Sequence, residues 1–146
     1  EHFLSNLIRQ KFFAAIESLP PPSNSDQTWI LFLNEEEDHE IGLLFANYLI
    51  RQYGKKVIYL GARVPYQNLF GVIQNSNSTH LYTFFIKNQL DHELETLVTN
   101  LTSDFAHTTL CISGGDEKLK SMSTHKNIHL ISTVESLVDI IKPDNV

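Results

Sequence analysis

Cysteine is almost absent from this sequence, in which Cys111 is the only one among 146 residues. A single cysteine cannot form a disulfide within the chain. Cys111 lies inside the apolar run 108–113, so we expect it to be a buried strand residue. This cysteine usage favours a reducing, cytoplasmic location.

Basic residues and long hydrophobic runs are also scarce. Eleven Lys and Arg residues stand against 17 Asp and Glu, which gives a formal net charge of −6 at pH 7. Binding to DNA phosphates requires clustered Lys and Arg, so we expect any DNA contact to be made by an N-terminal domain outside this sequence. No apolar run approaches the roughly 20 residues that span a bilayer, and the first residues lack the layout of a signal peptide. Membrane partners are therefore not expected, and the sequence is typical of one domain of a longer protein.

Residues 1–19 have the pattern of an amphipathic helix, with apolar side chains at helical spacing. Three prolines at 20–22 end this helix, and the polar residues that follow complete a linker over 20–27. One amphipathic helix cannot bury its apolar stripe alone, so we expect 1–19 to be the last helix of a helical-bundle cap. The remaining residues, 28–146, form the main domain.

Within 28–146, short apolar runs alternate with amphipathic stretches. The expected strands are 28–33, 56–61, 81–86, 108–113 and 128–132, and the expected helices follow them at 41–53, 66–74, 91–101, 116–122 and 134–142. Trp29 falls in the first strand and is expected in the core, and Gly54, Asp91 and Thr133 are expected at helix ends. This alternation predicts an α/β, flavodoxin-like five-stranded parallel sheet with helices on both faces. Ligands of this fold bind at the carboxyl ends of the strands.

The loops at that edge exclude two classes of protein with this fold. A response-regulator receiver domain needs an Asp after the third strand and a Lys after the fifth, but the sequence has 86–88 (Ile-Lys-Asn) and 132–133 (Ser-Thr) there. A flavin mononucleotide site needs a hydroxyl- and glycine-rich loop after the first strand, whereas 35–40 is acidic and would repel phosphate.

The segment Glu37-Asp38-His39-Glu40-Ile41-Gly42 resembles the Asp-x-His-x-x-Gly signature of cobalamin-binding domains, with Glu in the place of Asp. The resemblance implies that His39 is the lower ligand of the cobalt of cobalamin. It implies that Gly42 lets the corrin approach the backbone closely. It also implies that Glu37 accepts a hydrogen bond from the far nitrogen of the ring, which fixes the tautomer of His39.

Three further motifs of the same domains have counterparts later in the chain. Gly61, Val64 and Pro65 match a Leu-Gly-x-x-Val-Pro turn. Gly114 and Gly115 match a Gly-Gly pair that leaves room for the nucleotide tail of the cofactor. Thr83-Phe84-Phe85 is the best match to a Ser-x-Leu motif: Thr83 keeps the hydroxyl, and Phe85 is expected to narrow the tail pocket.

Glu1-His2, at the head of the first helix, resembles the Glu-His of the Trp-x9-Glu-His motif of cobalamin-dependent MerR-type transcription regulators. This resemblance implies a sensor domain that binds adenosylcobalamin or methylcobalamin, and Glu1 and His2 then belong to the binding site. It further implies a homo-oligomer in the full-length protein, an upper corrin face covered by the bundle, and no enzyme activity.

Two other functions stay open at this stage. The domain could be a degenerate relative that has lost its cofactor and acts in dimerisation or protein interaction, which Glu37 and Thr83-x-Phe85 favour, whereas His39, Gly42 and the glycine pair favour binding. Corrinoid methyltransferases and mutases use the same module, but they place their chemistry on a barrel that this sequence lacks. The other acids around His39, which are Glu35, Glu36, Asp38 and Glu40, are expected to be solvating and helix-end charges.

Overall fold

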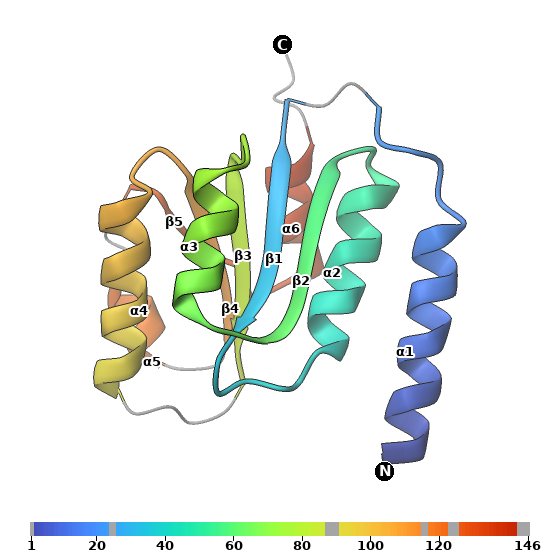
Figure 1. Ribbon diagram of the computed structural model, residues 1–146, viewed down its shortest axis with the longest axis horizontal. Helices are drawn as coiled ribbons and strands as arrows, with labels where there is room; N and C mark the ends of the chain where they lie inside the picture. Colours follow the sequence, from blue (N-terminus) through green and yellow to red (C-terminus); the bar gives the residue numbers. More distant parts are fainter. Residues whose placement is uncertain (1, 24–25, 87–90, 115–116, 123–125, 143–146) are drawn as a thin grey trace.

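Five parallel strands form one sheet in the order β2-β1-β3-β4-β5 in the computed structural model (Figure 1). The structure describes residues 2–23, 26–86, 91–114, 117–122 and 126–142. The strands are β1 (Thr28–Asn34), β2 (Lys56–Val64), β3 (His80–Phe85), β4 (Thr109–Gly114) and β5 (Ile128–Leu130). The helices are α1 (His2–Glu17), α2 (Ile41–Gln52), α3 (Tyr66–Gln74), α4 (Asp91–Asp104), α5 (Glu117–Met122) and α6 (Val134–Ile141). The flavodoxin-like fold predicted from the sequence is confirmed.

The sheet separates two hydrophobic clusters because successive side chains of a strand point to opposite faces. Along β1, Ile30 and Phe32 pack with α3, α4 and α5, whereas Trp29, Leu31 and Leu33 pack with α2 and α6. Trp29 and Cys111 have no exposed surface, so the sequence placed both correctly in the core.

Helix α1 lies outside this layered domain and packs against α2 (Figure 1). The ring of Phe12 meets that of Phe45 edge to face at 6.3 Å between centroids. Phe3, Leu4 and Leu7 on α1 are 82%, 60% and 41% exposed. The apolar stripe of α1 is thus only partly buried by α2. That α1 is the last helix of a helical-bundle cap stays a prediction.

The helix ends follow the sequence closely. Gly54 has φ = 77° just after α2. Thr133 caps α6, since its side chain accepts a hydrogen bond from the backbone N–H of Ser136 in a capping box. Helix α4 begins at Asp91, whose side chain is outside the described residues. None of the helices described is both long enough and apolar enough to cross a membrane.

Candidate functional site

Glu37, in the loop between β1 and α2, is a buried carboxylate at the carboxyl edge of the sheet. It has no exposed surface. Its Oε1 accepts hydrogen bonds from the backbone N–H groups of Asp38 and His39, both at 3.0 Å. Its Oε2 accepts one from the N–H of Ile86, at 3.1 Å, just beyond β3. These hydrogen bonds offset the cost of burying the charge and fix the loop against the end of β3.

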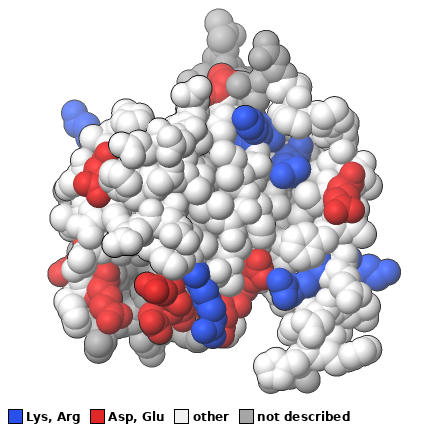
Figure 2. Space-filling model, in the orientation of Figure 1, with Lys and Arg blue, Asp and Glu red and all other residues white. Residues whose placement is uncertain are grey.

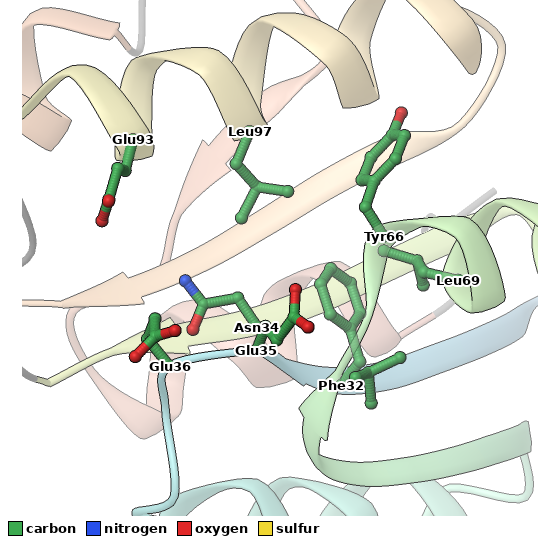
Figure 3. A pocket seen from close by; sticks show the side chains of 9 residues that line it. Phe32, Asn34, Glu35, Glu36, Tyr66, Leu69, Glu93 and Leu97 are labelled. Atoms are coloured by element: carbon green, nitrogen blue, oxygen red, sulfur yellow. The ribbon is translucent and has the colours of Figure 1, made fainter.

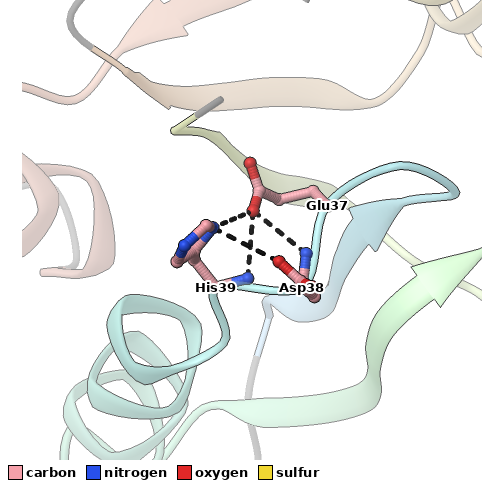
Figure 4. A group of neighbouring side chains, drawn as sticks. All are labelled: Glu37, Asp38 and His39. Carbon is pink, nitrogen blue, oxygen red and sulfur yellow. Dashed lines mark hydrogen bonds and ion pairs between the residues drawn. The ribbon is translucent and has the colours of Figure 1, made fainter. Parts of the chain in front are cut away.

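The same carboxylate orients the ring of His39 (Figure 4). His39 Nδ1 lies 2.6 Å from Glu37 Oε1, which confirms the hydrogen bond predicted from the sequence. Because an ionised carboxylate only accepts, Nδ1 carries the hydrogen and the lone pair of the neutral ring is on Nε2. The His39 side chain is 54% exposed, and among the described residues Nε2 has no hydrogen-bond partner. This arrangement presents one imidazole nitrogen, in a fixed tautomer, to a ligand.

The acids on either side of His39 were expected to be solvating and helix-end charges. Glu40 does lie at the N-cap of α2, but both acids are ion-paired, which the sequence did not indicate. Asp38 Oδ2 lies 3.1 Å from an Nη2 of Arg63, on β2. Glu40 Oε2 lies 2.8 Å from Nη2 of Arg9, on α1. Glu40 Oε1 accepts a 2.7 Å hydrogen bond from the hydroxyl of Tyr59. Burial, together with the adjacent Glu40, raises the pKa of Tyr59 well above its usual value, so the phenol remains a donor.

An irregularity in β2 makes room for this network. The pairing of β1 with β2 shifts between Leu31 and Phe32 and again before Asn34, and Gly61 has φ = 81° there. A Cβ on Gly61 would lie 3.0 Å from Glu40 Oε1, so the glycine gives space to that carboxylate. Val64 packs against the cluster under α3 and α4, and Pro65 precedes α3 at its N-cap. These matched motif residues therefore each have a structural role of their own.

A first cavity, of about 380 Å³, lies in front of His39. One wall is α1, and the other is the loop that carries His39. The lining residues are His2, Ser5, Arg9, Asp38, His39, Glu40, Ile41, Gly42 and Ile86. The fold thus brings His2 and His39 to one cavity, and Glu1 lies outside the described residues. That His2 takes part in binding stays a prediction.

A second cavity, of about 580 Å³, lies between α2 and α6 at the carboxyl edge of the sheet, and Gly42 borders both cavities. Aromatic and aliphatic side chains form most of it, including Phe45, Tyr82, Phe84 and Leu137. Ser113, Thr133 and Lys120 add polar groups. Its composition suits a largely apolar group that carries a few hydrogen-bonding atoms.

The position of Thr83 and Phe85 differs from the expectation. Phe85 packs in the cluster under α3 and α4, and Thr83 is fully buried. Neither lines the second cavity, because Tyr82 and Phe84 are the residues of β3 on that face. A shift of one residue moves every side chain of a strand to the other face. The residues of β3 that line the second cavity, Tyr82 and Phe84, therefore each lie one position before the residues matched to Ser-x-Leu, Thr83 and Phe85.

Two of the matched glycines lie in close packing with the protein itself, more tightly at Gly114 than at Gly42. A Cβ on Gly42 would lie 3.0 Å from the ring of Phe84. A Cβ on Gly114 would lie 2.8 Å from the carbonyl oxygen of Phe85 and from Leu119. Gly115 lies outside the described residues. Gly42 and Gly114 are thus explained by packing whether or not a ligand binds.

A third, smaller cavity of about 250 Å³ lies on the other face of the sheet, the face covered by α3 and α4 (Figure 3). Glu35, Glu36, Asn34 and Glu93 surround it above an apolar floor that includes Phe32 and Leu69. None of these residues lines the His39 cavity. Glu35 and Glu36 therefore lie apart from the candidate site, although they are neighbours of Glu37 in sequence.

Several solved structures share this fold, and three of them are of proteins named for cobalamin or corrinoid. The monomethylamine corrinoid protein of Methanosarcina barkeri superposes with a TM-score of 0.69 at 13% identity, over 94% of this chain and 66% of that chain. The methanol:cobalamin methyltransferase complex MtaBC of the same organism gives 0.65 at 18%, over 78% and 46%. A cobalamin-binding protein of Desulfitobacterium hafniense DCB-2 gives 0.60 at 16%, over 70% and 52%.

Among curated proteins, the HTH-type transcriptional repressor CarH of Myxococcus xanthus is a relative, 33% identical over 69 residues. The aligned segment covers 47% of this chain and 22% of the repressor. The similarity to this repressor thus extends over less than half of this chain and less than a quarter of the repressor. A scan against protein-family models gave no match.

Proposed function

We propose that this chain is the cobalamin-binding sensor domain of a MerR-type transcription regulator, with His39 as the lower ligand of cobalt. The observation that carries the proposal is the Glu37–His39 pair: a buried carboxylate holds Nδ1 at 2.6 Å and leaves Nε2 directed outward on a half-exposed ring. Imidazole is a suitable ligand for divalent and trivalent metals of this kind, and a carboxylate on its far nitrogen raises its basicity.

The remaining residues of the site fit the cofactor. Gly42 and His2 line the cavity in which the corrin would lie over His39. The larger cavity between α2 and α6 would receive the nucleotide tail, for which Ser113, Thr133 and Lys120 offer polar partners. Bound cobalamin would supply a metal centre with an exchangeable upper ligand, either adenosyl or methyl.

The regulatory output belongs to the same proposal. Homo-oligomerisation and DNA binding would reside in the whole regulator, with DNA contacted by a domain beyond these residues. The charge of −6 supports this division, because Lys and Arg occur only in small, separate groups on the face shown in Figure 2. The relationship to CarH supports the regulatory role.

Cobinamide, a corrinoid without a nucleotide base, provides the test. The chain is incubated with cobinamide or with hydroxocobalamin, and free corrinoid is removed by gel filtration. We expect corrinoid to co-elute with the protein and the visible spectrum of cobinamide to change to that of a nitrogen-ligated cobalt, since His39 is the nitrogen donor. Elution of folded protein without corrinoid absorbance would reject the proposal.

A second candidate function is supported by the aromatic rings on β3. The Phe84 ring takes the space next to Gly42, and the Tyr82 hydroxyl is 2.7 Å from Ser113 Oγ, where together they narrow the second cavity. A domain that has lost its cofactor and works in protein interaction would tolerate such filling. Absence of binding by a well-folded chain would favour this interpretation.

Phe84→Leu tests whether the ring restricts the second cavity. If the nucleotide tail enters beside Phe84, a smaller side chain should tighten hydroxocobalamin binding by about fivefold or more, since relief of overpacking is typically worth about 1–3 kcal/mol. Cobinamide affinity should not change, because cobinamide has no tail. Phe85→Leu is the matched control on the opposite face of β3 and should leave both affinities unchanged. All affinities are measured by titration. Tighter hydroxocobalamin binding in Phe85→Leu but not in Phe84→Leu would show that the nucleotide tail lies on the Phe85 face instead.

A further inference from the structure

Glu40, the residue after His39, joins three elements at one point. Its carboxylate lies between Arg9 of α1 and Tyr59 of β2, at 2.8 Å and 2.7 Å. Although Glu40 occupies the N-cap position of α2, its side chain makes no capping hydrogen bond. The side chain is instead committed to contacts with other elements, and it is only 10% exposed.

Aromatic contacts reinforce this junction of Arg9, Glu40 and Tyr59. The guanidinium of Arg9 lies 6.0 Å from the centroid of the Phe13 ring, and Phe13 meets Tyr59 edge to face at 6.4 Å. Gly61 leaves room for the carboxylate, as described above. Arg9 of α1 and Glu40 also line the cavity in front of His39, where their ion pair joins α1 to the loop that carries His39.

We infer that Glu40 is a positioning residue that holds α1 opposite His39, so that α1 forms the second wall of the ligand site before a ligand arrives. In a preorganised site, ligand binding does not have to offset the free-energy cost of ordering the protein around the ligand. Breaking the Arg9–Glu40 pair should therefore weaken ligand binding without removing the His39 ligand. By reciprocity, a ligand held between the two walls should make α1 more stable. This inference rests on the proposed function and adds the connection to α1.

The test combines a double-mutant cycle with hydrogen exchange on the 146-residue chain. Glu40→Gln keeps an acceptor for Tyr59 but removes the charge, and Arg9→Met keeps an aliphatic stem over Phe13. Each variant should raise the exchange rate of the α1 amides and weaken hydroxocobalamin binding by about two- to fivefold, the value of a partly exposed ion pair. The double variant should lose no more than either single variant, because both remove one interaction. The spectrum of nitrogen-ligated cobinamide should persist in all three variants, because His39 is unchanged in them.

Asp38→Asn is the matched control, because it breaks the ion pair with Arg63 on the other side of His39. It should leave the exchange of the α1 amides unchanged. Additive losses in the double variant would mean that Arg9 contacts the ligand directly, and unchanged α1 exchange in Glu40→Gln would mean that Glu40 does not hold α1; either result overturns the inference. If the wild-type protein binds no corrinoid, the proposed function is rejected instead. Hydrogen exchange of the α1 amides in the ligand-free variants would still test whether Glu40 fixes the position of α1.

Discussion

His39→Ala is expected to abolish the spectrum of nitrogen-ligated cobinamide and to cause the largest loss of corrinoid affinity of any single change considered. The imidazole is the only nitrogen donor offered by the loop after β1, and its Nε2 is directed outward. The fold should survive, because the side chain is half-exposed and contributes little to the core. Far-ultraviolet circular dichroism checks the fold, and titration followed by visible absorbance checks the ligand.

A histidine elsewhere on the domain provides the matched control. His92→Ala, which removes an exposed histidine of α4, should behave as wild type. A ligated spectrum that survives in His39→Ala, or that is lost in His92→Ala, would rule out His39 as the ligand.

Glu37→Ala is expected to have the second-largest effect. Loss of a group that orients a metal-bound histidine typically lowers metal affinity by about 10–100-fold. The change also leaves three backbone N–H groups, those of Asp38, His39 and Ile86, without their acceptor. The thermal midpoint should therefore fall along with the affinity.

Glu36→Ala provides the matched control one residue earlier. Glu36 is exposed and borders the separate acidic cavity, so both the affinity and the thermal midpoint should stay close to wild type. Glu37→Asp should keep part of the affinity, since the carboxylate remains but is one methylene shorter. Equal affinity in wild type and Glu37→Ala would show that the orientation of His39 does not depend on this carboxylate.

Local pattern was sufficient for most of the fold. The apolar runs at 28–33 and 81–86 became β1 and β3 within a residue or so, and the 66–74 helix begins and ends where its pattern does. The parallel sheet followed from the alternation of strand and helix, because parallel strands need helical crossovers, and the observed strand order is the flavodoxin-like one common for five such units. The partner of the His39 ring was also predictable, since Glu37 lies two residues away in the same loop.

Contacts between distant segments were not predictable in this way. Asp38 and Glu40 were expected to be solvating and helix-end charges, and their ion pairs were not predicted. The partners, Arg63 and Arg9, lie 63 − 38 = 25 and 40 − 9 = 31 positions away in the sequence. No local pattern marks such a pair. Only the packing of α1 on α2 and the irregularity in β2 bring those arginines to the loop.

The sequence by itself determined the doubly covered parallel sheet, the loop that carries His39 and the carboxylate that orients its ring. The tertiary structure alone decided that Tyr82 and Phe84, rather than Thr83 and Phe85, face the second cavity. A strand in which both faces are buried is apolar on both, so its sequence carries no alternation that distinguishes them. The face of each side chain is set by pairing with neighbouring strands, and in β3 that pairing turns Phe85 toward α3 and α4 and Phe84 toward Gly42.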